Sequence, residues 1–275
     1  MHAKNSSMDK MQELKDFIRK FDKVAIAFSG GVDSATLAAL CMKELKDVVA
    51  LTVVSPAMPS REMKHVKEVA KKIGIKHELI YLNLLEDENF VANTSERCFY
   101  CKLKILESIL EFCKRHGYSA VFEGTNADEL KEHRPGYRAV KFFKNVYSPW
   151  AMFNFKKEEI RFIAKKMGFS FYNKPPLACL ATRIPFGVKI DEKKLKMIDK
   201  AENEVLEIFK LKEVRVRFID DFAVIEAEKE EISKFFDLNL IDEVVRKLKK
   251  IGFKRVLLDL EGYKSGKLTN DFNKI

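Results

Sequence analysis

Several residue types are scarce in this chain of 275 residues, and their scarcity excludes whole classes of protein. Glycine and proline number only 11 and 7, too few for a collagen-like or a long disordered chain. No apolar run approaches the ~20 residues that a membrane-spanning helix needs. Residues 1–12 are polar and lack the apolar core of a signal peptide. We therefore expect a cytoplasmic protein without a membrane partner.

Acidic residues are fewer than basic ones, 41 against 51, so the formal net charge is +10. A basic balance favours anionic partners such as nucleotides, phosphates or nucleic acid, although a solvated lysine-rich surface produces the same excess. Hydrophobic residues make up 47% and charged residues 33%, a mixture typical of globular proteins. The length allows one large domain or two of ordinary size.

Cysteine occurs five times, and an odd number without a secretion signal argues against a disulfide framework. Cys41 and Cys113 fall within expected amphipathic helices, where they are predicted to be small buried apolar residues. Cys98 and Cys101 form a C-x-x-C motif at the start of an expected helix, and Cys179 stands alone in a proline-rich loop. These last three are the candidates for ligands or nucleophiles.

Short apolar segments alternate with amphipathic ones through the first two thirds of the chain. The apolar segments suit strands buried on both faces of a parallel sheet, at residues 23–28, 48–54, 76–81 and 119–122. The amphipathic segments predict helices at residues 8–20, 33–45, 59–73 and 98–116. This alternation implies right-handed crossovers, so we predict an α/β fold with a doubly wound parallel sheet.

The pattern changes after about residue 185, where a smaller α+β domain is predicted. Its helices are expected at residues 191–209 and 240–251. Its strands and one turn are expected at residues 213–218, 223–227, 255–260 and 220–221. The proline-containing stretch 173–188 is the expected junction. We therefore predict two domains, residues 1–185 and residues 186–275.

The strongest local motif is Ser29-Gly-Gly-Val-Asp-Ser34, between the first expected strand and the helix that follows. Its glycines allow positive φ and close approach of a ligand, and the helix N-terminus offers free N–H groups to an anion. The motif has neither the Gly-Lys-Ser/Thr of ordinary ATPases nor G-x-G-x-x-G, which disfavours both families. The alternative is a glycine turn in which Asp33 or Ser34 caps the helix.

This motif resembles the pyrophosphate loop (PP-loop) of the ATP pyrophosphatase superfamily, whose fold is adenine nucleotide alpha hydrolase-like. Members of that superfamily cleave ATP between the α and β phosphates and adenylate a carbonyl oxygen. The resemblance implies ATP and Mg²⁺ as cofactors. It also implies that pyrophosphate is held by Ser29, Gly30, Gly31, Asp33 and Ser34.

The chemistry of Cys98, Cys101 and Cys179 has three explanations that the residues alone do not separate. A C-x-x-C pair can be a redox couple, but it then needs a thioredoxin-like context that this chain lacks. Three thiolates with a fourth ligand can bind zinc. Three thiolates can also hold an iron–sulfur cluster that leaves one iron open.

A longer series of motifs resembles the LarE family of ATP-dependent sacrificial sulfur transferases over nearly the full chain. These motifs stand at residues 96–102, 123–130, 133–136, 174–185, 214–217 and 258–266. The family takes part in the biosynthesis of the nickel-pincer nucleotide cofactor of lactate racemase. It thiolates the carboxylates of pyridinium-3,5-biscarboxylic acid mononucleotide, so the resemblance implies a small anionic substrate.

The resemblance also implies a mechanism. ATP adenylates a substrate carboxylate, pyrophosphate leaves, and a sulfur nucleophile then displaces AMP. In members with one cysteine, which Cys179 matches, that cysteine gives up its own sulfur and becomes dehydroalanine. In members with three cysteines, the trio resembles a [4Fe–4S] site whose open iron carries a sulfide. Because this chain has Cys98, Cys101 and Cys179, we expect a [4Fe–4S] cluster and cluster-borne sulfur.

Further nucleotide-binding residues follow from the resemblance. Gly124, Thr125 and Asn126 are implied at the nucleotide, with a helix cap as the alternative for Asn126. Asp128 is implied near Mg²⁺ or pyrophosphate. Arg134 is implied near the phosphates, with a loop salt bridge as its alternative.

Cations are expected around Cys179 because the implied substrate is anionic. Arg183 follows Cys179 by four residues and is predicted to act in catalysis. Arg215 and Arg217 alternate on one expected strand and share a face, so we expect them to bind the substrate phosphate. The alternative is a pair of solvent-facing arginines. Glu226, on the neighbouring strand, is expected to pair with them or to hold a metal. The smaller domain would thus contribute to phosphate binding and to oligomerisation.

Other functions are compatible with parts of this pattern. The thiolation of tRNA, known in the superfamily, would explain the basic charge, but no added RNA-binding domain is visible. An amidotransferase-type synthetase would need a glutaminase domain or an ammonia supply, and an ATP or AMP sensor would not need the cysteine trio. We therefore expect a sulfur transferase for a small anionic molecule, without a nucleic-acid partner. By analogy with the family we also expect a homo-oligomer such as a hexamer.

Overall fold

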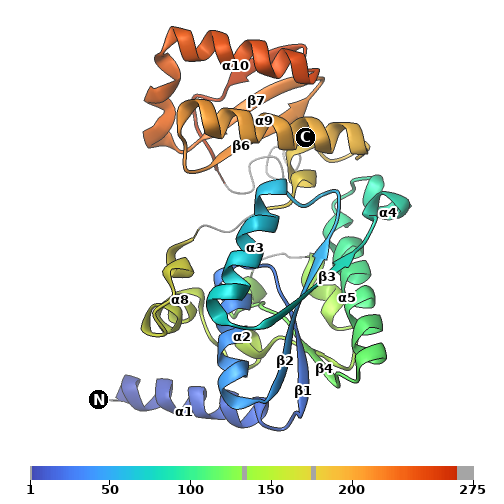
Figure 1. Cartoon of the computed structure of the whole chain (residues 1–275), viewed down its shortest axis with the longest axis vertical. Helices are drawn as coiled ribbons and strands as arrows, with labels where there is room; N and C mark the ends of the chain where they lie inside the picture. Colours follow the sequence, from blue (N-terminus) through green and yellow to red (C-terminus); the bar gives the residue numbers. More distant parts are fainter. Residues whose placement is uncertain (1, 132–134, 175–177, 265–275) are drawn as a thin grey trace. The chain divides into compact units, whose positions relative to one another are not determined.

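The computed structural model describes the chain except for residues 1, 132–134, 175–177 and 265–275 (Figure 1). The backbone separates into two compact units. The first unit consists of Met1–Ser55, Glu62–Asn83 and Glu96–Leu177. The second unit consists of Pro56–Arg61, Leu84–Ser95 and Ala178–Ile275. The polypeptide therefore passes five times from one unit to the other.

The first unit is built on a five-stranded parallel sheet with the order β3-β2-β1-β4-β5. The strands are β1 (Lys23–Ala27), β2 (Asp47–Val54), β3 (Lys76–Tyr81), β4 (Ala120–Phe122) and β5 (Val146–Tyr147). The central residues of β1 and β2 are buried on both faces, as the uninterrupted apolar runs of these segments predict. The predicted parallel sheet is therefore confirmed.

The strand order changes direction between β1 and β4. The chain proceeds from β1 through β2 to β3 on one side of the sheet, and β4 and β5 follow on the other side of β1. In open α/β sheets, ligands bind at the carboxyl ends of the strands where the order reverses. The loops that follow Ala27 and Phe122 both leave the sheet at this position.

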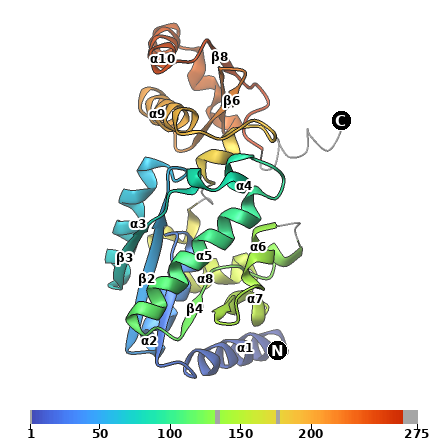
Figure 2. The ribbon, with the colours of Figure 1, turned by 90° about the vertical axis from the view of Figure 1, so that its right-hand side faces the viewer.

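Helices cover both faces of this sheet. α5 (Arg97–His116) lies on one face and α2 (Val32–Glu44) on the other, as Figure 2 shows. Leu106 and Ile109 of α5 pack with Val49 and Val121 of the strands. The remaining elements are α1 (His2–Ile18), α3 (Ser60–Ile73), α6 (Pro135–Val140), α7 (Pro149–Met152), α8 (Lys157–Lys166), η2 (Glu129–Lys131) and η3 (Ser170–Asn173). No helix in the described part of the chain is both long and apolar enough to cross a membrane.

The second unit contains a separate mixed sheet in the order β6-β7-β8. β6 (Val214–Ile219) and β7 (Phe222–Ala227) are antiparallel, and β8 (Arg255–Leu258) runs parallel to β7. Asp220 and Asp221 have φ values of 49° and 66°, the backbone of a tight turn between antiparallel strands. The other elements are η1 (Leu84–Glu86), α4 (Glu88–Val91), η4 (Leu180–Arg183), α9 (Glu192–Phe209), η5 (Lys229–Phe236) and α10 (Leu238–Ile251). The predicted smaller α+β domain is confirmed.

One strand and three α-helices of the first unit were not predicted from the sequence: β5, α6, α7 and α8. The short helices η2 and η3 were not predicted either. β5 has two residues, and α6 and α7 have six and four, so none of them is long enough to show a periodic pattern. α8 has ten residues and buries Ile160 and Ala164 at helical spacing, so its sequence does carry a helical signal. Its position is important because its first residue reaches the candidate site.

Leu106 is fully buried in α5 against the sheet, so truncating its side chain leaves a cavity among close-packed neighbours. We expect Leu106→Ala to lower the free energy of unfolding by about 3 kcal/mol, measured by urea denaturation. The control is Met152→Ala, because Met152 is half exposed and its truncation should change that free energy by less than about 0.5 kcal/mol. Equal effects of the two substitutions would contradict the burial of Leu106.

Candidate functional site

The loop after β1 is held in shape by its own two serines. Ser34 Oγ lies 3.2 Å from Ser29 N and 3.1 Å from Ser29 Oγ, and it donates to Gly31 O at 3.2 Å. Gly30 has φ +71°, and a Cβ there would meet Val66 Cγ2 at 3.0 Å, so this position requires glycine. Among the described residues, no side chain caps the start of α2, so the capping alternative for Asp33 and Ser34 is not found. The N–H groups of this helix terminus are therefore open to an anion.

The loop after β4 lies directly against the start of α2. A Cβ on Gly124 would come within 3.0 Å of Ser34 N and 3.2 Å of Asp33 Cβ, so only glycine allows this approach. Asn126 is buried and its Nδ2 lies 3.4 Å from Asp33 Oδ1. Its Oδ1 accepts from Asp128 N at 3.1 Å, so Asn126 both shapes its own turn and contacts the first loop.

Lys157, the first residue of α8, links the two carboxylates of this region. Its Nζ forms an ion pair with Asp33, and its backbone N–H donates to Asp128 Oδ2 at 2.9 Å. Trp150 Nε1 donates to Asp33 O at 3.0 Å and fixes the same turn from behind. Lys157 was missed at the level of sequence, because no motif connects a lysine to a loop more than 120 residues earlier in the chain.

A cavity of about 560 Å³ opens between these loops and α5 within the first unit. That volume lies within the range of small-molecule sites. Its lining includes Ser29, Asp33, Ser34, Cys98, Lys102, Glu123, Gly124 and Thr125. The predicted PP-loop residues and the predicted residues after β4 are thus brought together, whereas Arg134 lies outside the described residues.

Glu123 is a buried carboxylate at the end of β4 that was not singled out from the sequence. It accepts from Lys102 Nζ at 2.9 Å, from Thr125 Oγ1 at 2.9 Å and from Ser148 Oγ. Burial raises its pKa, but Lys102, Ser148 and Thr125 outweigh burial and hold that pKa below its ordinary value. An ionised Glu123 therefore orients Lys102 and Thr125 at the cavity wall. A charged residue directly after a buried strand is the signal that could have revealed it.

The cysteines divide into inert and accessible thiols. Burial raises the pKa of Cys113 to about 12 and raises that of Cys41 further, which confirms both as buried, unreactive residues. Cys98 is exposed and lines the cavity, and Cys101 is half buried one helical turn later. Cys179 is half buried and belongs to the second unit.

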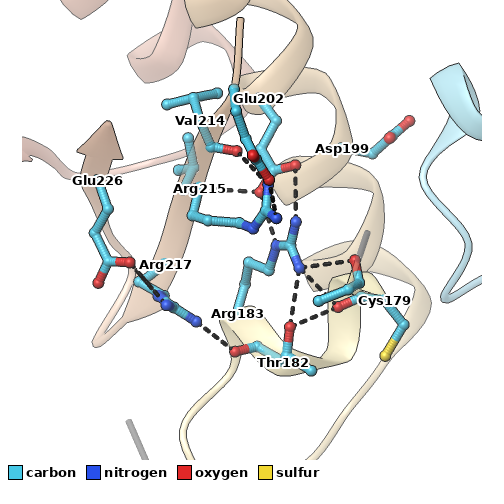
Figure 3. Close-up of polar contacts among 12 residues, drawn as sticks. Cys179, Thr182, Arg183, Asp199, Glu202, Val214, Arg215, Arg217 and Glu226 are labelled. Atoms are coloured by element: carbon cyan, nitrogen blue, oxygen red, sulfur yellow. Dashed lines mark hydrogen bonds and ion pairs between the residues drawn. The ribbon is translucent and has the colours of Figure 1, made fainter. Parts of the chain in front are cut away.

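The loop that carries Cys179 is bound to a fully buried arginine, as Figure 3 shows. Arg183 Nη1 donates to the carbonyl oxygens of Ala178 at 2.9 Å and Cys179 at 3.0 Å, and to Thr182 Oγ1 at 2.9 Å. Arg183 has 0% exposed surface. The geometry favours a role in holding the loop, and the direct catalytic role expected for Arg183 stays a prediction.

Glu202 of α9 neutralises Arg183 and is itself fully buried. Its carboxylate accepts from Arg183 Nε at 2.8 Å, from Arg61 Nη2 at 2.7 Å and from Val216 N at 3.2 Å. Burial raises the pKa of Glu202, but the charges of Arg183 and Arg61 outweigh it and lower that pKa below the ordinary value. Glu202 and Arg61 are functional candidates that were missed at the level of sequence.

Arg215 and Arg217 are buried, so the alternative of two solvent-facing arginines is wrong. Arg217 donates to Glu226 Oε2 at 2.7 Å and to Thr182 O at 2.7 Å, which bears out the expected pairing with Glu226. Arg215 forms an ion pair with Glu213, and its buried Nε has no hydrogen-bond partner among the described residues. A buried donor without a partner is uncommon in folded proteins, so this atom is a candidate contact for a ligand.

A metal site is not assembled by the described residues. They contain no group of three or more His, Cys, Asp or Glu side chains that could hold a metal ion. Cys98 and Cys101 belong to the first unit and Cys179 to the second, so neither unit alone contains the thiol trio. The expected [4Fe–4S] cluster therefore stays a prediction.

Comparison with known proteins finds a matching family model and relatives that match nearly the whole chain. The family model for "Queuosine biosynthesis protein QueC" matches residues 23–98, which include the PP-loop. An uncharacterized protein of Synechocystis sp. is 36% identical over 96% of this chain and 98% of its own length. An uncharacterized protein of Methanocaldococcus jannaschii is 33% identical over 94% of this chain and 98% of its own length.

A third relative has a function in its name. The pyridinium-3,5-bisthiocarboxylic acid mononucleotide synthase of Lactiplantibacillus plantarum is 27% identical over 94% of this chain and 92% of its own length. All three matches extend over nearly the whole of both chains, and the PP-loop has the geometry that its motif predicts. The chain therefore belongs to the LarE-like family of PP-loop enzymes.

Proposed function

We propose that this enzyme uses ATP to convert a carboxylate of a small anionic, nucleotide-like molecule into a thiocarboxylate. The observation that carries the proposal is the cavity of the first unit, where a PP-loop without a Walker lysine meets the residues after β4. The name of the Lactiplantibacillus plantarum relative supports pyridinium-3,5-biscarboxylic acid mononucleotide as the acceptor. Sulfur transfer also needs a thiol, and Cys179 supplies one on a structured loop.

The first step is the activation of the carboxylate. A carboxylate oxygen of the acceptor attacks the α-phosphorus of ATP, the bond to the bridging oxygen of the β-phosphate breaks, and pyrophosphate leaves. Ser29, Ser34 and the free N–H groups at the start of α2 hold the pyrophosphate. Asp33 and Asp128 would hold Mg²⁺, which when bound offsets the charge of the leaving group. Gly124, Thr125 and Asn126 would contact the nucleotide.

The second step delivers sulfur. The Cys179 thiolate attacks the acyl carbon, and AMP leaves with the electron pair of the broken acyl–oxygen bond, giving a thioester. Removal of the Cα proton of Cys179 then breaks the Cβ–Sγ bond, whose electron pair stays on sulfur. The products are the thiocarboxylate and dehydroalanine, and no added oxidant or reductant is needed. The predicted cluster would supply a sulfide in place of the Cys179 sulfur, and neither of these two steps depends on it.

The phosphate of the acceptor is assigned to Arg215 and Arg217. Arg217, whose three nitrogens contact Glu226 and Thr182 O, would have to exchange one of these contacts for the phosphate. The unpartnered Nε of Arg215 supports this assignment, because a buried guanidinium donor gains most from an anion. Glu226 keeps Arg217 in place by a pair of hydrogen bonds to one carboxylate oxygen. A homo-oligomer remains part of the proposal. The thiolation of tRNA is the second candidate, favoured by the net charge of +10.

ATP should be cleaved to AMP and pyrophosphate, because the PP-loop lacks the lysine that ordinary ATPases place on the β and γ phosphates. Asp33→Ala and Ser34→Ala should each lower this cleavage by about 100-fold, the scale for losing one group that stabilises a leaving anion. The nucleotide products are separated by anion-exchange chromatography with the acceptor present. ADP as the main product would reject the proposed reaction.

Cys179→Ala should retain acceptor-dependent release of pyrophosphate in the first turnover and form no thiocarboxylate, because activation needs no thiol. Cys98→Ala identifies the sulfur source. With Cys179 as the donor, Cys98→Ala still transfers up to one sulfur per chain, and mass spectrometry finds Cys179 lighter by the mass of H₂S. With a cluster as the donor, Cys98→Ala transfers none. Normal thiolation by Cys179→Ala would refute both versions.

Protein purified without oxygen should be brown and contain iron and acid-labile sulfide in equal amounts if Cys98, Cys101 and Cys179 bind the predicted cluster. Cys41→Ala and Cys113→Ala are the controls and should retain the iron, because both thiols are buried and their pKa values are raised. A colourless protein with stoichiometric zinc would contradict the prediction. Loss of iron in either control would show that the wrong thiols were chosen.

A further inference from the structure

The backbone on both sides of Cys179 is held by hydrogen bonds, while the residue itself is only half buried. The carbonyl oxygen of Cys179 accepts hydrogen bonds from Thr182 Oγ1 at 2.7 Å, Arg183 Nη1 at 3.0 Å and Thr182 N at 3.1 Å. The next peptide N–H, that of Leu180, donates to Ala57 O at 2.8 Å. Figure 3 shows Sγ directed away from the Arg183 guanidinium. Among the described residues, no hydrogen bond to this sulfur is found.

The guanidinium of Arg183 has two distinct sides. Its Nη1 contacts three acceptors of the loop, the oxygens of Ala178, Cys179 and Thr182. Its Nε and Nη2 face the Glu202 carboxylate at 2.8 Å and 3.3 Å. Every nitrogen of this side chain is therefore engaged within the protein. Arg183 is not available to a substrate in this arrangement.

Burial makes Arg183 dependent on Glu202. Both side chains have 0% exposed surface, and an unpaired charge at such a position is strongly unfavourable. Glu202 is in turn held by Arg61 Nη2 at 2.7 Å and by the backbone N–H of Val216 at 3.2 Å. Without the carboxylate, the guanidinium would have to move towards water and would release the carbonyl oxygen of Cys179.

We propose that the buried pair of Arg183 and Glu202 positions Cys179 for the sulfur-delivery step. The proposal rests on the proposed function, in which the Cys179 sulfur must reach an activated acyl carbon at roughly 3–3.5 Å. A displacement of about 1 Å from such a geometry costs about 100-fold in rate. Arg183 and Glu202 contact no reacting atom, so they are positioning residues and not catalytic ones.

The test separates the two half-reactions in Glu202→Gln, which keeps the shape of the side chain and removes its charge. With pyridinium-3,5-biscarboxylic acid mononucleotide and ATP, pyrophosphate release in the first turnover should stay within about twofold of the native rate. Thiocarboxylate formation should slow by about 100-fold. Equal loss in both half-reactions, or no loss in either, would overturn the proposal. The control is Lys247→Met, which removes a surface ion pair between α9 and α10 and should change neither rate.

A second pair of variants covers the case in which Glu202→Gln does not fold. Thr182→Val removes the hydroxyl that contacts both Arg183 and the carbonyl oxygen of Cys179, without disturbing the buried charges. It should slow thiocarboxylate formation by about tenfold and leave pyrophosphate release unchanged. Thr182→Ser, which restores the hydroxyl, should recover the native rate. Failure of Thr182→Ser to recover it would count against the hydrogen bonds as the cause.

Amide hydrogen exchange tests positioning without any acceptor. Glu202→Gln should raise exchange in residues 178–184 at least tenfold and leave the PP-loop, residues 29–34, unchanged. Unchanged exchange in residues 178–184 would overturn the proposal whatever the activity. If the native enzyme forms no thiocarboxylate while exchange rises as expected, the proposed function fails and the positioning of Cys179 stands. The two failures are therefore distinguishable.

Discussion

The arrangement of several elements in the second unit depends on Arg183, a charged arginine that is buried next to Cys179. Because Arg183 is removed from water, it needs an ionised partner at the same depth, and Glu202 provides one. The same carboxylate reaches β6 through Val216 N and the first turn of α3 through Arg61. One buried carboxylate thus connects a loop, a strand and a helix that lie far apart in the sequence. Moving any of them would leave a buried charge or donor without its partner.

The first unit uses a buried carboxylate in a related way. Glu123 stays ionised because Lys102 and two hydroxyl groups outweigh its burial, and it thereby orders the wall of the cavity in the first unit. In both units a residue of the candidate site lies one contact away from the buried charge and is itself less buried. This arrangement combines a rigid support with an accessible group. The buried charge is costly to bury and stays in place, while the neighbouring, less buried residue remains open to a ligand.

The sequence predicts the parts of the molecule that are determined by residues close together in the chain. β1, β2 and α5 follow from uninterrupted or amphipathic apolar patterns, and the PP-loop follows from glycines between a strand and a helix. Lys157 and Glu202 could not be predicted, because each acts through a partner that only the fold brings near. Glu123 carries a local signal, its position directly after a buried strand, but its contact with Lys102 comes from the fold. Arg183 is a different case. Its spacing of four residues from Cys179 predicted that the two residues act together, but only its burial indicates that it holds the Cys179 loop and does not contact a substrate.

The two units are interleaved along the chain. Pro56–Arg61 and Leu84–Ser95, which follow β2 and β3, belong to the second unit and supply its Arg61, Ala57 and Asn93 contacts. A gene fragment beginning at Ala178 would encode Thr182, Arg183 and Glu202 but would lack Ala57, Arg61 and Asn93, which contact Leu180, Glu202 and Pro185. The second unit consists of three separate segments of the chain, so recombination of one continuous gene segment could not transfer it intact to another enzyme. Its evolution is therefore tied to that of the five-stranded sheet, because segments that follow two strands of that sheet form part of it.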